Sequence, residues 1–534
     1  MDNLLSTILW LPLVGAVILV AVPRGRDEVF KTGGLLVSLA TFLVSLVMLG
    51  RFREGEAGFQ LVETRPWIPS WGINYSLGVD GISLWLVLLT TLLTPVVLLA
   101  SRTSITKYVK EYVIAMLVLE LGMIGTFLAL DLLVFYIFFE LMLLPMYLII
   151  GVWGGANRVY AAIKFFLFTI AGSLLMLLAI IYLVFLQYQE TGIPSFAISD
   201  LYAISIPFNV QAMLFFAFAL AFAIKVPLFP LHTWLPDAHV EAPTGGSIIL
   251  AGVLLKIGTY GFIRFVLPFF PEATARYAPW LATLAVIGII YGALVAWVQA
   301  DLKKLVAYSS VSHLGFCVLG IFALDQAAME GSILQMINHG LSTGALFLLV
   351  GVIYERRHTR LMEDFGGLAK SMPLFATIFV IATLSSAGLP GLNGFVGEFL
   401  ILAGSFRWSP LFATIAATGV ILAALYLLLM LQKVLFGPIT REENRTVRDM
   451  RWHELVAVLP LVILMFWIGF FPGTFLRKMT PSVQQLLTSV QAGRSAPGTH
   501  LVDGIDPHAR RVAHLEPDRL RDAPTKAETG GGTR

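Results

Sequence analysis

Long apolar runs recur along almost the whole chain and are separated by short polar segments. Each run has about 18 or more residues, the length that an α-helix needs to cross the roughly 30 Å hydrocarbon core of a bilayer. Only 13% of the 534 residues are charged, about half of the share found in soluble domains. A soluble chain of this length would need polar surfaces around two or more domains. The pattern therefore predicts an all-α integral membrane protein.

The apolar runs predict about fourteen transmembrane helices. Their expected ranges are 4–22, 30–50, 79–100, 112–130, 131–153, 162–187, 208–238, 244–267, 278–299, 304–324, 330–353, 373–405, 410–433 and 454–475. The first run has no basic segment before it and no polar mature domain after it. We therefore expect a spanning helix there, and not a cleaved signal peptide.

Two of the expected spans, 208–238 and 373–405, are long and contain helix-breaking residues. The breaks are expected at Pro227 and Pro230 in the first span, and at Pro390 and Gly391 in the second. Proline removes a backbone donor and clashes with the preceding turn. Backbone groups freed at membrane depth need protein or water partners, so broken helices lie in shielded places or line cavities. Broken helices in matching positions of two halves indicate a transport site.

The five-helix spacing between the two breaks predicts a duplicated unit, helices 4–8 followed by helices 9–13. The expected parts are residues 1–110 with helices 1–3, residues 111–270 and 271–435 with the two repeats, and residues 436–478 with helix 14. Residues 479–534 are rich in Arg, Asp, Pro, Gly and Thr. Such a segment buries too little apolar surface to fold alone, and we expect a disordered or partner-bound tail.

Lysine and arginine are concentrated in the loops that follow odd-numbered helices. This bias places those loops in the cytoplasm. An even number of helices then places both termini on the outer side of the membrane. The net charge of +3 gives no indication of nucleic-acid binding.

Ionisable residues lie near the middle of several expected spans. They are Glu140, Lys225, Lys256, His313, His339 and Glu398. A charge at a helix centre costs at least about 2.5–3.5 kcal/mol, so such residues are usually paired, hydrated or functional. Burial changes their proton affinities, and the charge on one site shifts its neighbour. Histidine accepts and releases protons near neutral pH. Together these residues indicate proton translocation.

Structural explanations exist for some of these residues. Polar pairs hold membrane helices together, and Glu140 with Lys225 would be such a pair. A lone histidine in a membrane helix is often a core residue with its hydrogen bonds satisfied, which applies to His313 and His339. Lys256 has no obvious partner nearby in the sequence, which argues against a purely structural role for the whole set.

A second group of polar residues follows the first predicted break, with His232, Asp237 and His239 close to Glu241. These residue types can bind zinc. However, the intervening prolines break any shared helical face and no metallohydrolase spacing is present. We expect a supporting role, such as a point of proton entry or exit. Asp131 is also a supporting candidate, or simply the N-cap of a helix.

The sequence excludes several other chemistries. Cys317 is the only cysteine, which rules out an internal disulfide framework, an iron–sulfur site or a cysteine-based zinc site. Nucleotide-binding glycine fingerprints, catalytic triads and flavin motifs are missing from the chain. We expect no cofactor and no metal in this chain.

Several stretches resemble the antiporter-like proton-pumping subunits of respiratory complex I, NADH:quinone oxidoreductase. They are residues 139–147, 164–173, 225–256 and 388–399, with the most specific run at 226–239. The resemblance covers roughly residues 1–475. Glu398 stands where chains L and N usually carry lysine, so the chain resembles the chain M branch, which includes mitochondrial subunit 4. It also lacks the long lateral helix of chain L.

The resemblance implies fourteen helices with inverted five-helix repeats and breaks in helices 7 and 12. It implies proton transfer at Glu140, Lys225, Lys256 and Glu398, connected by His313 and His339. Neighbouring chains L and N and small membrane chains are the implied partners in the bilayer. Other subunits would hold FMN, iron–sulfur clusters and quinone, so this chain contributes to the enzyme without its own redox centre. A multi-pass location in a bacterial inner membrane, with periplasmic termini, is also implied.

Three other functions remain open from the sequence. The chain has features expected of a subunit of a multisubunit cation/proton antiporter or of a membrane-bound hydrogenase. A stand-alone secondary transporter for a small solute is a different class. A structural scaffold without proton traffic is a third.

Overall fold

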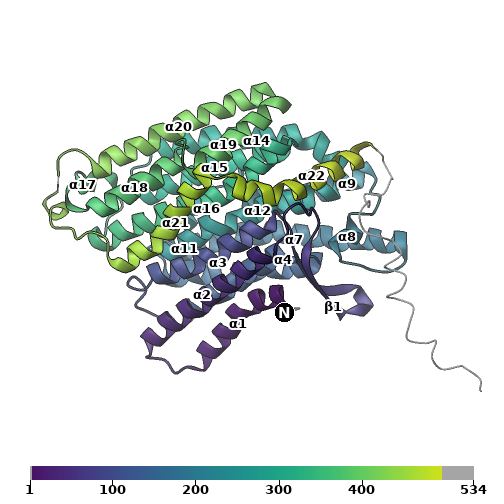
Figure 1. Ribbon diagram of the computed structural model, residues 1–534, viewed down its shortest axis with the longest axis horizontal. Coiled ribbons are helices and arrows are strands. Elements are labelled where there is room, and N and C mark those ends of the chain that lie inside the picture. The colour runs from purple at the N-terminus through teal and green to yellow at the C-terminus, as the bar shows by residue number, and fades with distance from the viewer. Residues whose placement is uncertain (1–2, 440, 496–534) are drawn as a thin grey trace, which may run out of the picture.

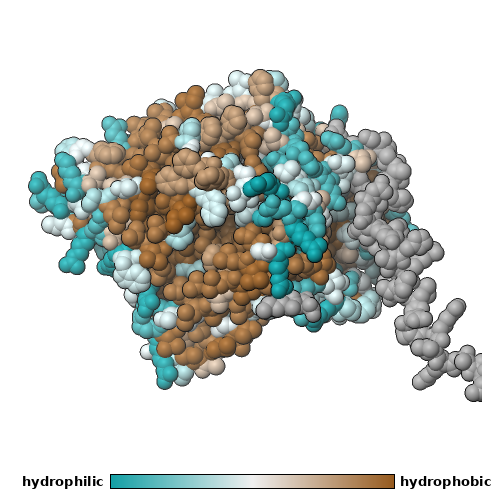
Figure 2. All heavy atoms as spheres, in the orientation of Figure 1, coloured by the Kyte–Doolittle hydropathy of each residue, from teal (hydrophilic) through white to brown (hydrophobic). Residues whose placement is uncertain are grey.

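The computed structural model describes residues 3–439 and 441–495 and shows a bundle of long helices (Figure 1). Thirteen helical segments within the described residues are long and apolar enough to cross a membrane. The expected span 373–405 is divided into two shorter helices, α18 and α19, and is not among the thirteen. The prediction of an all-α integral membrane protein is confirmed. Figure 2 shows apolar side chains over most of the visible face, with polar ones at its edges and in a band right of its centre.

The first half of the bundle contains the helices up to residue 269. They are α1 (Leu4–Ala21), α2 (Asp27–Arg51), α3 (Ser83–Ala100), α4 (Val109–Leu128), α5 (Leu132–Leu141), α6 (Leu143–Trp153), α7 (Arg158–Thr191), α8 (Ile198–Leu201), α9 (Phe208–Lys225), α10 (Trp234–Glu241), α11 (Thr244–Ile249), α12 (Leu255–Gly261) and α13 (Leu267–Phe269). Helices α11 to α13 form one continuous span, 244–269, with π-helical segments at Leu250–Leu254 and Phe262–Val266.

The second half contains the remaining helices. They are α14 (Pro271–Trp297), α15 (Leu302–Phe322), α16 (Gln326–Arg357), α17 (Leu368–Ser371), α18 (Pro373–Ser386), α19 (Asn393–Trp408), α20 (Pro410–Leu435), α21 (Trp452–Phe470) and α22 (Gly473–Ser495). Helix α16 is 32 residues long, and its best 18-residue window is fully buried. It packs against α15, α18 and α19 and also contacts the π-helical segment Leu250–Leu254, so it links the two halves.

The first helix break separates α9 from α10. The chain leaves the helix after Lys225 and passes through the cis peptide bond between Phe229 and Pro230. The indole nitrogen of Trp234 donates a hydrogen bond to the Ile224 carbonyl oxygen at 2.9 Å. This bond satisfies one of the carbonyl groups that the break leaves without a helical partner.

The second break separates α18 from α19. Gly388 and Gly391 adopt φ angles of 77° and 92°, in the left-handed region that favours glycine. Asn338 on α16 donates a hydrogen bond to the Asn393 carbonyl oxygen at 2.7 Å. At the first break the Trp234 indole thus replaces a lost backbone partner, whereas at the second break the Asn338 amide ties the start of α19 to α16.

Two parts of the fold differ from the sequence prediction. Residues 51–78, expected as a loop, contain most of an antiparallel hairpin of β1 (Gln60–Ile68) and β2 (Ile73–Val79), and the next helix begins at Ser83, not at residue 79. Residues 479–495, expected in the tail, belong to helix α22. The residues of α22 that pack inward are Phe475, Met479, Val483, Leu487 and Val490. Their spacing of four, four, four and three residues gives one apolar helical face, and that face makes the helix stable despite its polar composition. The rest of the predicted tail, 496–534, lies outside the described residues.

Candidate functional site

Two of the predicted residues meet between the halves of the bundle. Lys256 on α12 is fully buried, and its Nζ lies 2.6 Å from Nδ1 of His339 on α16. Nζ also donates a hydrogen bond to the Ala251 carbonyl oxygen, which belongs to the π-helical segment before it. A π-helical turn is often found at a functional site. Here it presents a carbonyl oxygen to a buried ammonium group.

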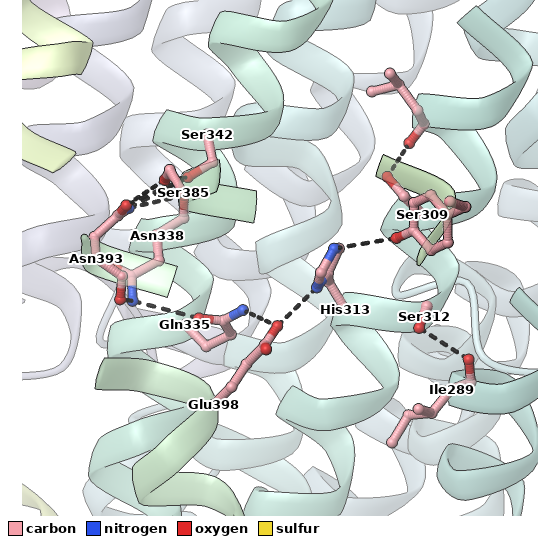
Figure 3. A network of polar contacts seen from close by, with 12 residues as sticks. Ile289, Ser309, Ser312, His313, Gln335, Asn338, Ser342, Ser385, Asn393 and Glu398 are labelled. Carbon is pink, nitrogen blue, oxygen red and sulfur yellow. Dashed lines mark hydrogen bonds and ion pairs between the residues drawn. The ribbon is translucent and has the colours of Figure 1, made fainter. Parts of the chain in front are cut away.

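A second pair lies on the other side of His339. His313 on α15 approaches Glu398 on α19, with Nδ1 and Oε1 separated by 2.8 Å. The side-chain amide of Gln335 donates a further hydrogen bond to the same carboxylate oxygen at 3.0 Å. Figure 3 shows Glu398 between His313 and Gln335. Both His313 and Glu398 are nearly inaccessible to solvent.

The two pairs are adjacent. The ring centroids of His313 and His339 are 6.0 Å apart. No hydrogen bond joins the two rings within the described residues. A small cavity of about 10 Å³, about the room that one water needs, lies beside both rings. Its lining includes Gln335, Asn338, Ser342, Thr343, Ser385 and Ser386. A polar cavity with several donors and acceptors suits an ordered water, which would bridge the two rings.

Buried amides and hydroxyls fix the helix break beside this cavity. Asn393, at the start of α19, accepts hydrogen bonds from Ser385 and from Ser342, the latter at 3.5 Å. Ser342 and Ser385 are 2.5 Å apart between their hydroxyl oxygens (Figure 3). Asn338 and Gln335 are joined at 3.3 Å. This network ties α16 to both halves of the broken span.

The predicted pair of Glu140 and Lys225 is not in direct contact. No ion pair within 4.0 Å joins them in the part of the chain that the structure describes. Lys225 is buried at the end of α9, and its Nζ lies 4.7 Å from the ring centroid of Phe139. Glu140 is half-buried, with the Tyr136 hydroxyl beside its carboxyl group. An aromatic ring adjoining Glu140 therefore covers the lysine.

The supporting residues around the first break separate into different environments. Asp237 is half-buried and forms an ion pair with Lys164 at 2.6 Å. His232 is buried among aromatic rings, 5.0 Å from Tyr291 between centroids. His239 is fully buried and stacks on Phe347 at 4.6 Å. Neither ring nitrogen of His239 has a hydrogen-bond partner within the described residues.

Asp131 has a structural role. Its carboxylate accepts hydrogen bonds from the Leu133 and Val134 amides and caps α5. It also accepts one from the Asn74 amide at 2.9 Å, which attaches the β-hairpin to the bundle. Of the predicted break residues, Pro227 is buried, whereas Pro390 is exposed and Gly391 is partly exposed.

Sequence reasoning missed several residues that contact the site. Gln335, Asn338, Asn393 and Ser385 are neutral polar residues, and their types alone gave no signal above that of other membrane-helix contacts. Lys303, at the start of α15, was assigned to a loop. It is buried and donates hydrogen bonds to the carbonyl oxygens of Val240 and Ala242 at the end of α10. A cation there complements the negative end of that helix.

No group of three or more His, Cys, Asp or Glu residues that could hold a metal ion occurs among residues 3–439 and 441–495. The arrangement consists of a buried lysine, two imidazole rings and a carboxylate on four different helices. Each of these groups can exist with or without a transferable proton. Chemically, the arrangement suits proton transfer.

Comparison with protein families gives two matches. Residues 129–425 match a family described as "NADH:quinone oxidoreductase/Mrp antiporter, TM". Residues 57–126 match the amino terminus of NADH-ubiquinone oxidoreductase chain 4.

Individual relatives are similar over most of the chain. NADH-quinone oxidoreductase subunit M of Rhodobacter capsulatus is 47% identical over 504 residues, covering 92% of this chain and 98% of that protein. NADH-ubiquinone oxidoreductase chain 4 of Marchantia polymorpha is 46% identical, covering 90% and 97%.

Solved structures share the fold. A chain of respiratory complex I from Thermus thermophilus, solved with bound NADH, superposes with a TM-score of 0.83 at 35% identity and covers 91% of this chain and 99% of that one. A chain of the Mrp complex from Dietzia sp. superposes with a TM-score of 0.81 at 22% identity, covering 92% and 99%. The latter likeness concerns the fold alone.

Proposed function

This chain belongs to the family of membrane subunits that includes NADH-quinone oxidoreductase subunit M and NADH-ubiquinone oxidoreductase chain 4, and we propose that it transfers protons along Lys256, His339, His313 and Glu398. It is a multi-pass membrane protein and an antiporter-like subunit of the oxidoreductase, an enzyme complex. The observation that supports the route is the line of contacts Lys256–His339 and His313–Glu398.

The transfer begins at the Lys256–His339 pair. When Lys256 is charged, its ammonium group donates a hydrogen bond to the neutral ring of His339 at Nδ1. A change in charge nearby shifts the proton between these two groups, because contact at an effective dielectric constant of 20 is worth about 4 kcal/mol. The Ala251 carbonyl oxygen stabilises the charged lysine. The pair therefore holds one proton whose position responds to the surroundings.

The proton then passes to the His313–Glu398 pair. A water in the cavity would carry it from Nε2 of His339, which has no partner within the described residues, to Nε2 of His313, which has a 3.5 Å contact with the Tyr426 hydroxyl. His313 delivers it from Nδ1 to Oε1 of Glu398 over 2.8 Å. Gln335 keeps that oxygen oriented. Glu398 is the last acceptor and releases the proton toward the outer side.

Glu140 and Lys225 act upstream in this proposal. Lys225 is buried against Phe139 and has no ion pair with Glu140 within the described part of the chain. Movement of α5 relative to α9 would bring the two charges together or apart, and the charge on Lys225 would thereby change. That change would set the charge state of Lys256. The two predicted repeats, residues 111–270 and 271–435, would thus act together in proton transfer.

We further propose the setting of the chain. Other membrane subunits, including chains L and N and small membrane chains, flank it in the bilayer. FMN, iron–sulfur clusters and quinone belong to other subunits. The membrane is the bacterial inner membrane, with both termini on the periplasmic side. Residues 1–110, 111–270, 271–435 and 436–478 are the proposed structural parts.

The route is tested by His313→Gln in the complete complex. Glutamine retains a hydrogen-bonding group beside Glu398 but does not carry the proton. We expect proton pumping driven by NADH oxidation in sealed vesicles to fall about tenfold, which corresponds to about 1.4 kcal/mol on the barrier. His358→Gln is the matched control, because His358 lies at the C-terminal end of α16 and is not one of the four residues of the proposed route. Full pumping by His313→Gln would overturn the route.

A further inference from the structure

An open cleft at one end of the bundle lies outside the proton route. It has a volume of about 560 Å³ and is formed by the start of α2, the end of α3 and the start of α21. Its lining residues are Glu28, Lys31, Leu99, Arg102, Thr103, Trp452 and His453. Two cationic side chains, Lys31 and Arg102, and the imidazole of His453 thus face one opening between membrane-spanning helices.

The cations in the cleft outnumber its carboxylates. Arg102 forms an ion pair with Glu28 at 2.6 Å, and Lys31 approaches the same carboxylate at 3.4 Å. One carboxylate therefore serves two cations. Because Glu28 and Arg102 are both substantially exposed, their pairing is weak and leaves Arg102 available to another anion.

His453 adds a buried donor without a partner. The residue as a whole is only 8% exposed, yet its Nε2 has no hydrogen-bond partner within the described residues. A buried polar group without a partner costs roughly 1–3 kcal/mol. A ligand that accepts a hydrogen bond from Nε2 would remove this cost. This observation is independent of the charges and indicates an anionic or polar ligand in the cleft.

The cleft lies at a membrane boundary. The membrane span of α3 ends at Ala100, just before Arg102, and that of α21 begins at Trp452. Trp452 is 73% exposed, and tryptophan is common at the level of lipid headgroups. Apolar side chains are exposed farther along both flanking helices, at Leu36, Leu39 and Leu43 on α2 and at Val456, Leu459 and Ile463 on α21. Two of the helices that line the charged cleft therefore offer exposed apolar surface that acyl chains could cover.

We propose that this cleft binds the phosphate headgroup of an anionic glycerophospholipid. The phosphate oxygens accept hydrogen bonds from Arg102, Lys31 and Nε2 of His453, and the acyl chains lie along α2 and α21. Basic pockets between transmembrane helices are suited to such headgroups. Glu28 opposes binding, because it competes with the phosphate for Arg102 and Lys31. The adjacent apolar faces favour a lipid over a free phosphate ion.

The test uses the complete complex in nanodiscs that contain a photoactivatable phosphatidylglycerol. Crosslinks to peptides around residues 99–103 and 452–453 are quantified by mass spectrometry. Each interfacial Arg or Lys contributes about 1 kcal/mol to binding of an anionic lipid, so Arg102→Gln is expected to lower crosslinking about fivefold. His453→Gln is expected to lower it as well, and Glu28→Gln to raise it.

Arg24→Gln is the matched control, since Arg24 pairs with Glu111 in the same way but does not line the cleft. We expect it to leave crosslinking unchanged, and we expect phosphatidylglycerol to compete better than phosphatidylcholine or inorganic phosphate. Equal competition by phosphatidylcholine would overturn the proposal of an anionic lipid. Competition by inorganic phosphate at the same concentration would show a free-anion site. Arg102→Gln behaving like Arg24→Gln would also contradict the proposal. The readout is independent of pumping, so it distinguishes this inference from the proposed proton route.

Discussion

Nζ of Lys256 and Nδ1 of His339 lie 2.6 Å apart, although 83 residues separate them in the chain. The contact joins the π-helical span of the first half to the long helix α16 of the second. Buried lysine beside a neutral imidazole is a pairing in which one proton can be held by either group. This relationship leads to predictions that separate proton transfer from simple structural support.

Replacing Lys256 by methionine or by arginine is expected to give the same functional result. Methionine removes the transferable proton. Arginine keeps a positive charge but does not lose its proton in proteins, so it fails as a relay. We expect NADH-driven proton pumping in vesicles to fall about tenfold in both variants. If Lys256→Arg pumps normally, the lysine serves only as a fixed charge. Lys370→Met, on the short helix α17 away from the site, is the control.

Replacing Glu398 by glutamine is expected to preserve packing and strongly reduce proton release. The amide fills the same space beside His313 and Gln335 but cannot be ionised. Pumping should fall about tenfold, whereas Glu398→Asp should retain part of it. The control is Glu330→Gln, because Glu330 is a buried carboxyl group on α16 that contacts Gln326 and not the histidines. Equal losses in both glutamine variants would argue against a special role for Glu398.

Replacing Asn393 by alanine is expected to destabilise the break between α18 and α19. The change leaves Ser385 and Ser342 without a shared buried partner. Each unsatisfied buried group costs roughly 1–3 kcal/mol. The purified complex should unfold at a lower temperature, as monitored by tryptophan fluorescence. Asn157→Ala is the control, since the Asn157 side chain is exposed and makes no cap hydrogen bond. An unchanged transition in Asn393→Ala would contradict the network.

The Asp325–Arg407 pair is expected to give stability that depends on acid pH. Burial of Asp325 disfavours its charged form, but hydrogen bonds from Arg407 and the first amides of α16 outweigh burial and lower the pKa of Asp325. A lowered pKa in the folded state contributes stability above the unfolded-state pKa. That stability is lost as pH falls below about 4.

Thermal unfolding of the complex between pH 7 and pH 3 measures this effect. Arg407→Gln should make the loss of stability at acid pH smaller, because the pKa of Asp325 then moves back toward its ordinary value. Asp325→Ala should lower stability at neutral pH by about 1 kcal/mol through loss of the N-cap of α16. A pH profile identical in wild type and Arg407→Gln would contradict the assigned pairing.

That ionisable residues inside the apolar runs would be buried and have polar partners was predictable from their chemistry. Lys256 and Glu398 are ionisable residues in apolar runs, and insertion into the membrane makes such residues costly unless they are paired or functional. Which residues pair was not predictable. Lys256 contacts His339, and His313 contacts Glu398. Both contacts depend on how α16 packs against its neighbouring helices, and sequence patterns do not predict that packing.

An ion pair between Glu140 and Lys225 was one structural explanation open from the sequence, and the described part of the chain does not contain that pair. Opposite charges on adjacent helices suggest contact, but the break after Lys225 directs its side chain over the Phe139 ring. A helix over residues 479–495 was not predicted either, since these residues were expected in a disordered or partner-bound tail. The polar composition of this segment drew attention away from the regular spacing of its apolar residues from Phe475 to Val490. That spacing and packing against the bundle stabilise helix α22.

The central claim is that Lys256, His339, His313 and Glu398 form a continuous route for protons. An experimental density map of the complex, at a resolution that places ordered waters, tests it most directly. The account predicts an ordered water in the cavity between the rings of His339 and His313, hydrogen-bonded to both, with Lys256 and Glu398 at either end. A dry gap filled by apolar side chains, or Lys256 or Glu398 turned toward lipid, would contradict it.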